Sequence, residues 1–138
     1  MISEVIILAG GMGKRLKDAV PDMPKSMAPV RGHPFLDYQL QYLEEWGVSR
    51  FVLATGFKSD VIRNHYGDKY KEVEVLYSQE DQPMGTGGAV KKAMELAESK
   101  RILVVNGDTY FDVHLKRLEN FHVSRAAKLS MALHHVED

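Results

Sequence analysis

The chain of 138 residues contains no cysteine. It can therefore form no disulfide scaffold, and neither a cysteine nucleophile nor a cysteine-based metal site is available. Long apolar runs are also missing, because the first one, Val5–Leu8, is short and directly follows Glu4. A signal peptide or a membrane-spanning helix needs a longer apolar stretch, so we expect a cytoplasmic protein.

An excess of either charge is absent too, since 18 lysine and arginine residues stand against 19 aspartate and glutamate residues. The net charge of -1 gives no general field that would attract nucleic acid or a membrane surface, so neither partner is expected. Basic residues must then act locally, in a pocket. Hydrophobic residues fill 44% of the positions, which suffices for one sizeable core and one domain.

A glycine-rich turn follows Val5–Leu8, and this apolar run predicts a buried parallel strand. The turn reads Leu8-Ala9-Gly10-Gly11-Met12-Gly13-Lys14-Arg15-Leu16. Glycines at a helix start let backbone N–H groups approach a phosphate, and the helix start adds positive partial charge. The pattern predicts a loop that binds a polyphosphate, with a purely structural turn as the alternative for this motif taken alone.

The spacing within this turn excludes two commoner phosphate-binding motifs. A Walker A loop needs a glycine where Leu8 stands, five residues before Gly13. The dinucleotide fingerprint needs a glycine where Leu16 stands, counted from Gly11 and Gly13. Neither motif is therefore predicted.

The remaining chain alternates strands with helices, which predicts an α/β fold with a doubly wound, mostly parallel sheet. Lys17–Pro24 is expected to be an ordered surface excursion over the mouth of the loop. The expected strands are 51–54, 73–77, 102–105 and 128–136. The expected helices are 34–46, 60–66 with Ser59 as N-cap, 89–98 and 112–124.

Three further motifs carry polar groups that could bind a ligand. Lys25 lies in the proline-restrained segment Pro24-Lys25-Ser26-Met27, and a second glycine-rich turn, 83–89, follows a strand and Glu80. Asn106-Gly107-Asp108 ends the strand 102–105, at a carboxyl edge where open α/β sheets bind ligands. Taken singly, Lys25 also fits a solvated lysine, Glu80 a surface loop residue, and Asp108 a turn signal.

Together, the segments 8–16, 24–27, 83–89 and 106–108 resemble the sugar-1-phosphate nucleotidyltransferases, the pyrophosphorylases that make nucleotide sugars. The resemblance is greatest to mannose- and heptose-1-phosphate guanylyltransferases. It implies a Rossmann-like sheet with helices on both faces. It also implies a reaction in which a sugar 1-phosphate attacks the α-phosphorus of a nucleoside triphosphate and releases pyrophosphate, with Mg²⁺ as cofactor.

The resemblance also assigns roles to single residues. Arg15 would neutralise the departing pyrophosphate, Lys25 would bind the α-phosphate, and Asp108 would hold Mg²⁺. The nucleotide-binding residues would be Leu8, Ala9, Gly10, Gly11, Gly13 and Lys14 in the first loop and Gly85, Thr86 and Gly87 in the second. Relatives that use uridine or thymidine nucleotides typically carry glutamine in the place of Glu80. A carboxylate only accepts hydrogen bonds and suits the two adjacent donors of guanine, so we expect GTP to be favoured.

Three departures from the family pattern limit these expectations. Lys14 replaces a small hydroxyl residue, and Ser26 replaces a proline. The chain corresponds only to the nucleotide-binding part, 1–138, without the sugar-binding half and its second metal-binding aspartate. Two functions therefore stay open, a guanylyltransferase and a nucleotide-binding module without catalysis. We also expect a partner chain, as in a homo-oligomer, to cover the free edge of the truncated sheet.

Overall fold

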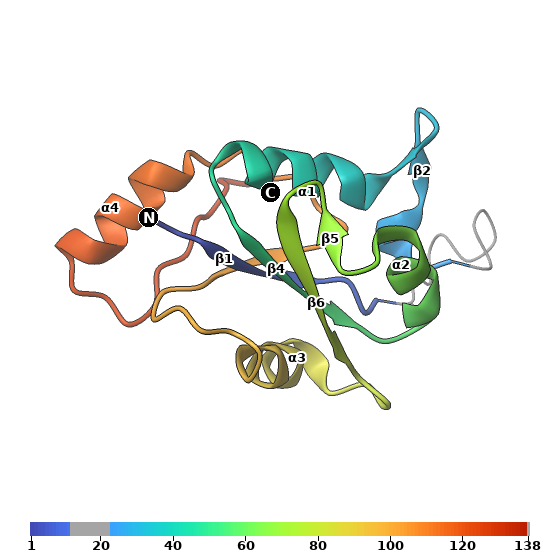
Figure 1. Ribbon diagram of the computed structural model, residues 1–138. Helices are drawn as coiled ribbons and strands as arrows, with labels where there is room; N and C mark the ends of the chain where they lie inside the picture. Colours follow the sequence, from blue (N-terminus) through green and yellow to red (C-terminus); the bar gives the residue numbers. More distant parts are fainter. Residues whose placement is uncertain (12–22, 138) are drawn as a thin grey trace.

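The computed structural model describes residues 1–11 and 23–137 of the chain. Its centre is a five-stranded sheet of order β5-β6-β4-β1-β7 (Figure 1). Its strands are β1 (Glu4–Leu8), β4 (Arg50–Thr55), β5 (Lys69–Tyr70), β6 (Val73–Gln79) and β7 (Leu103–Asn106). The pairs β1–β4, β1–β7 and β4–β6 are parallel, and only β5 runs antiparallel to its neighbour β6. The predicted α/β fold with a mostly parallel sheet is confirmed.

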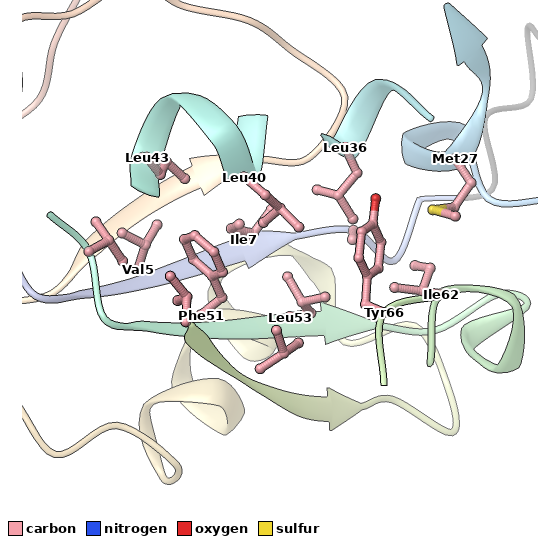
Figure 2. Packing of buried hydrophobic residues seen from close by; sticks show 14 of the residues in the cluster. Val5, Ile7, Met27, Leu36, Leu40, Leu43, Phe51, Leu53, Ile62 and Tyr66 are labelled. Carbon is pink, nitrogen blue, oxygen red and sulfur yellow. The ribbon is translucent and has the colours of Figure 1, made fainter. Parts of the chain in front are cut away.

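Helices cover both faces of this sheet, with α1 (Phe35–Glu45) and α3 (Gly85–Met94) on opposite sides (Figure 1). Helices α2 (Ser59–Tyr66) and α4 (Leu115–Ser124) contribute side chains to the core on the α1 side. Figure 2 shows Ile62 and Tyr66 of α2 in this core. A smaller core joins α3 to the other face through Ala89 and Ala93. None of the described helices is long and apolar enough to span a membrane.

Strand β1 shows why the first apolar run is continuous. Val5 and Ile7 pack into the core under α1, whereas Ile6 packs against α3, and all three side chains are fully buried. Successive side chains of a strand point to opposite faces, so a strand covered on both faces needs apolar residues at every position. The central position of β1 thus follows from its sequence.

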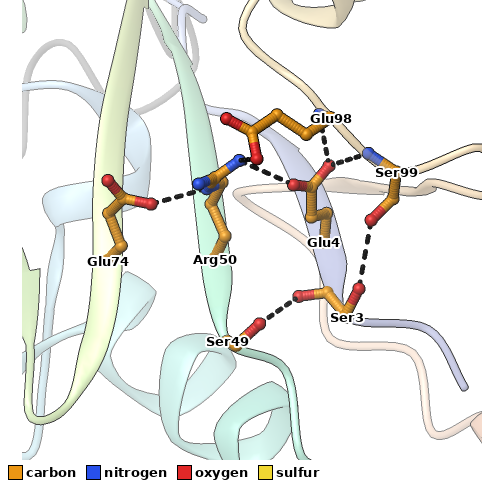
Figure 3. Close-up of polar contacts among 7 residues, drawn as sticks. All are labelled: Ser3, Glu4, Ser49, Arg50, Glu74, Glu98 and Ser99. Atoms are coloured by element: carbon orange, nitrogen blue, oxygen red, sulfur yellow. Dashed lines mark hydrogen bonds and ion pairs between the residues drawn. The ribbon is translucent and has the colours of Figure 1, made fainter.

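The amino-terminal ends of the strands are joined by a network of ion pairs (Figure 3). Arg50 on β4 pairs with Glu4 at 2.8 Å, Glu74 at 2.5 Å and Glu98 at 3.0 Å. The second oxygen of Glu4 accepts hydrogen bonds from the backbone N–H groups of Glu98 and Ser99, both at 2.9 Å. Every charge in this network therefore has a partner.

Several predicted boundaries shift. Pro34 is not helical: its backbone is extended, and it belongs to the small hairpin β2 (Pro29–Val30) and β3 (His33–Pro34), so α1 begins one residue later. Lys58, in the left-handed region at φ 53°, replaces Ser59 as N-cap of α2. Helix α4 begins at Leu115 rather than residue 112. The predicted start of α3 at residue 89 was wrong, because the second glycine-rich turn is itself the first turn of that helix.

The expected strand 128–136 is also wrong, since these residues belong to no strand of the described structure. Leu129, Met131 and Leu133 alternate as a strand requires, yet their exposed fractions are 77%, 69% and 79%. Alternation supplies an apolar face, but a strand also needs a neighbour for its backbone hydrogen bonds. The surface excursion predicted for Lys17–Pro24 lies mostly outside the described residues, and the partner chain at the sheet edge stays a prediction.

Candidate functional site

A cavity of about 310 Å³ opens where the parallel strands end. The short 3-10 helix η1 (Lys25–Met27), the turn after β7 and the start of α3 all contribute to its wall. Its lining residues are Leu8, Ala9, Gly10, Gly11, Lys25, Ser26, Glu80, Pro83, Gly85, Thr86, Asn106 and Asp108. Segments far apart in the sequence thus meet at the carboxyl edge, where open α/β sheets bind ligands.

The backbone segments that carry the lining residues are closely packed. The N–H of Gly107 donates to the Leu8 carbonyl at 2.8 Å, and a Cβ on Gly107 would lie 2.8 Å from that oxygen. A Cβ on Gly10 would lie 3.5 Å from the backbone nitrogen of Gly56, in the turn that follows β4. Glycine at position 107 is therefore needed for the close approach of its turn to the end of β1.

Lys25 and Asp108 form the ion pair of the site, and their Nζ and Oδ2 atoms lie 2.8 Å apart. Their side chains are 39% and 35% exposed. Thr109 Oγ1 donates to the other carboxylate oxygen, Oδ1, at 3.1 Å. Burial alone would raise the pKa of Asp108, but the hydrogen bonds from Lys25 and Thr109 and the charge of Lys25 together lower it. Asp108 is thus held as a carboxylate that faces the cavity.

Glu80 and the start of α3 also line the cavity. Glu80 follows β6, its backbone N–H donates to the Thr55 carbonyl at 2.8 Å, and its side chain is half-buried. Helix α3 begins at Gly85, which has φ 72°, and its N-cap residue Met84 makes no side-chain capping bond. The first N–H groups of a helix have no partner within the helix, so this end suits an anion.

The structure brings together nine of the residues that the sequence pointed to. They are Leu8, Ala9, Gly10, Gly11, Lys25, Glu80, Gly85, Thr86 and Asp108. Gly87 does not line the cavity: it is exposed within α3, because the helix begins earlier than expected. Gly13, Lys14 and Arg15 lie outside the described residues. Their assignments, like the roles of all the others, stay predictions.

Three lining residues had no predicted role, namely Ser26, Pro83 and Asn106. All three lie inside the motifs on which the resemblance rests, so the sequence could have indicated them as cavity residues. Asn106 is the last residue of β7, and the rule that located Asp108 at the carboxyl edge applies equally to it.

The donor set of the site suits a metal ion only in part. Among the described residues, no three histidine, aspartate or glutamate side chains are grouped closely enough to hold one. Two carboxylate residues, Asp108 and Glu80, line the cavity. Mg²⁺ prefers oxygen ligands and is commonly held by one or two carboxylates with substrate phosphates and water. A cavity lined by two carboxylates and by the start of a helix agrees with that pattern.

Comparison with known proteins agrees with this geometry. A protein-family model described as nucleotidyl transferase matches residues 4–138. The chain is 42% identical to D-glycero-alpha-D-manno-heptose 1-phosphate guanylyltransferase of Aneurinibacillus thermoaerophilus, over 94% of this chain and 56% of the relative. It is 37% identical to the enzyme of the same name from Campylobacter jejuni, over 98% of this chain and 59% of the relative.

A solved structure, HddC from Yersinia pseudotuberculosis complexed with GMP-PN, superposes with a TM-score of 0.79 at 37% identity. The match covers 88% of this chain and 55% of that protein. The chain thus spans little more than half the length of the relatives it matches.

Proposed function

Since this chain belongs to the nucleotidyl transferase family, we propose that it is the nucleotide-binding part of a guanylyltransferase that acts on a heptose or mannose 1-phosphate. Relatives bearing the name heptose 1-phosphate guanylyltransferase support the sugar class and the base. The observation that carries the proposal is the single cavity shared by Lys25, Asp108, Glu80 and the start of α3. It combines a cation, two carboxylates and helix N–H groups, which together suit a nucleoside triphosphate with its metal ion.

The reaction needs no nucleophile from the protein. An oxygen of the sugar 1-phosphate forms the new bond to the α-phosphorus of GTP, and the bond from that phosphorus to the bridging oxygen breaks. The electron pair leaves with pyrophosphate, and the product is a GDP-sugar. Such a transfer depends on positioning and charge compensation. Mg²⁺, held by Asp108 and the phosphates, would neutralise charge on the leaving group.

Lys25 is the described cation placed for this task. Its Nζ lies 2.8 Å from Asp108 Oδ2, so the α-phosphate of a bound nucleotide competes with that carboxylate for the ammonium. We propose that Lys25 turns from Asp108 to the phosphate and leaves the carboxylate to the metal ion. Gly13 and Lys14 for the triphosphate, and Arg15 for the pyrophosphate, are proposed on their sequence pattern alone.

The base preference rests on Glu80. It lines the same cavity as Lys25 and is anchored by its backbone to the end of β4. Guanine presents N1–H and the 2-amino group side by side, and a carboxylate accepts both, whereas uracil presents one N–H between two carbonyl oxygens. A bidentate contact of this kind discriminates between bases by about 1–3 kcal/mol.

Titration with GTP and with UTP tests this proposal. We expect the wild-type chain to bind GTP more tightly by about 1–3 kcal/mol, and Glu80→Gln to lose that preference. Equal affinity for the two nucleotides, or an unchanged preference in Glu80→Gln, would remove Glu80 from the role.

Pyrophosphate release from GTP in the presence of heptose or mannose 1-phosphate tests the transfer. Release above the hydrolysis background would support a guanylyltransferase. GTP binding without release would favour the alternative for this chain, a nucleotide-binding module. A cytoplasmic location and a homo-oligomer stay predictions.

A further inference from the structure

A buried amide on α1 holds the turn that carries Asp108. Gln39 is 5% exposed and lies on the inner face of α1, among Leu36, Leu40 and Leu43. Its Nε2 donates to the Asn106 carbonyl at 2.5 Å and to the Thr109 carbonyl at 2.7 Å. An amide nitrogen carries two hydrogens, so each carbonyl receives one.

The two carbonyls belong to the residues on either side of Gly107-Asp108. Gln39 therefore joins both ends of the turn, while the Gly107 N–H fixes its middle to Leu8 at 2.8 Å. The backbone around Asp108 is thus anchored to α1 and to β1. The position of the carboxylate follows from this backbone, because the aspartate side chain is short.

The oxygen of the Gln39 amide indicates that the two donated bonds are the reason for a glutamine at this position. Gln39 Oε1 is buried without a hydrogen-bond partner in the described structure. A buried acceptor without a donor costs free energy, which an apolar residue on this inner face would avoid. The orientation is also fixed, because a flipped amide would place Oε1 against two carbonyl oxygens.

We propose that Gln39 is a positioning residue for the nucleotidyl transfer site: it sets the place of the Asp108 carboxylate through the turn 106–109. The inference rests on the proposed function, in which Asp108 holds the metal ion bound with the nucleotide. Gln39 touches neither nucleotide nor metal. Its loss should therefore reduce only the part of nucleotide binding that depends on the metal.

Binding titrations separate these contributions, with Mn²⁺ as the metal probe. The metal increment is defined as the ratio of the affinity for GTP with Mn²⁺ to the affinity for GTP in EDTA. Gln39→Met keeps the length of the side chain but removes both donors. We expect metal-free GTP affinity to stay within about twofold and the metal increment to fall about tenfold, the usual cost of losing a supporting hydrogen bond behind a metal ligand.

Tyr42→Phe is the matched control. Tyr42 lies on the same helix, and its hydroxyl donates to the Val113 carbonyl at 2.5 Å, beyond the turn. This variant also loses one side-chain bond from α1 to a backbone carbonyl, but it should keep the metal increment. Hydrogen exchange of the Gly107 amide gives a readout without metal: it should quicken in Gln39→Met and stay unchanged in Tyr42→Phe.

Asp108→Asn distinguishes the two ways of failing. It should lose the metal increment by itself, and adding Gln39→Met to it should lower the increment no further. If Asp108→Asn keeps the increment, the proposed role of Asp108 fails, and the inference falls with it. If Asp108→Asn loses the increment while Gln39→Met retains it and the Gly107 amide exchanges as in wild type, Gln39 only fills space and the inference alone is overturned.

Discussion

The two ends of the same parallel strands are built in opposite ways. At the amino-terminal ends, Arg50 joins three carboxylates, and Glu4 is 5% exposed with both oxygens bonded (Figure 3). At the carboxyl ends, Lys25 and Asp108 pair with each other while more than a third of each side chain stays exposed. Two buried hydroxyls at this end, those of Ser26 and Thr55, have no partner in the described structure.

This difference separates the groups that stabilise the fold from those that are available to a ligand. The bonds of Glu74 and Glu98 raise the pKa of Arg50 and keep the network charged. Polar groups that are already satisfied gain little from a ligand, whereas a loosely held ion pair beside a cavity exchanges partners at small cost. We therefore expect changes at the amino-terminal ends to alter stability and changes at the carboxyl ends to alter binding.

The largest expected effect is the loss of stability in Glu4→Ala. The change removes the Arg50 contact at 2.8 Å and leaves the N–H groups of Glu98 and Ser99 without their acceptor. Breaking a buried charged network in this way costs about 3 kcal/mol of unfolding free energy. Urea denaturation measures the loss, and GTP affinity of the folded variant should stay unchanged. A loss of GTP affinity would show that the two ends are coupled.

Lys25→Met should weaken GTP binding and leave the stability nearly unchanged. The pair it breaks is partly exposed, so the unfolding free energy should change by less than about 0.5 kcal/mol. GTP affinity should fall about tenfold or more, because a charge-assisted bond to phosphate contributes roughly 1.5–3 kcal/mol. Lys100→Met is the control: it removes the same charge from an exposed position before β7, at the other end of the sheet. Equal GTP affinity in the two variants would contradict the role of Lys25.

Lowering the pH should reduce the unfolding free energy of the wild-type protein more than that of the Glu4→Gln variant. Burial opposes the ionised Glu4, but its backbone bonds to Ser99 and Glu98 and the charge of Arg50 together lower its pKa below the ordinary 4.5. A carboxyl with a lowered pKa contributes stability above its unfolded value, and that stability is lost as the pH falls through the folded value. Urea denaturation between pH 6 and pH 3 should therefore show a shallower fall in Glu4→Gln. An identical pH dependence would mean that other carboxyls carry the effect.

The smallest effect is expected for Thr55→Val, at the carboxyl end of β4. Thr55 is fully buried, and its hydroxyl has no partner in the described structure. Valine has nearly the same shape, so removing the unpaired hydroxyl should raise the unfolding free energy by about 1 kcal/mol or leave it unchanged. A clear loss of stability would show that this end, too, is held by satisfied polar groups.

Much of the molecule could be predicted from local pattern. The continuous apolar run of β1 required cover on both faces, and the alternation of strands with helices required a mostly parallel sheet. The site roles of Lys25 and Glu80 came from the resemblance to a known family. Because parallel strands end at one edge, the two glycine-rich turns and Asp108 could be placed at the same sheet from the sequence. Chain order and hydrophobic period were sufficient for these conclusions.

What only the tertiary structure decided depends on partners distant in sequence. Residues 128–136 have the alternation of a strand, yet they form none, because strand formation needs a neighbouring backbone. Helix α3 begins at Gly85 rather than Ala89, and Gly87 is therefore exposed instead of lining the cavity. Gln39 reads in the sequence as one polar residue of an amphipathic helix. Its role follows only from two carbonyls more than 60 residues away, because a hydrogen bond between distant segments leaves no periodic trace in either of them.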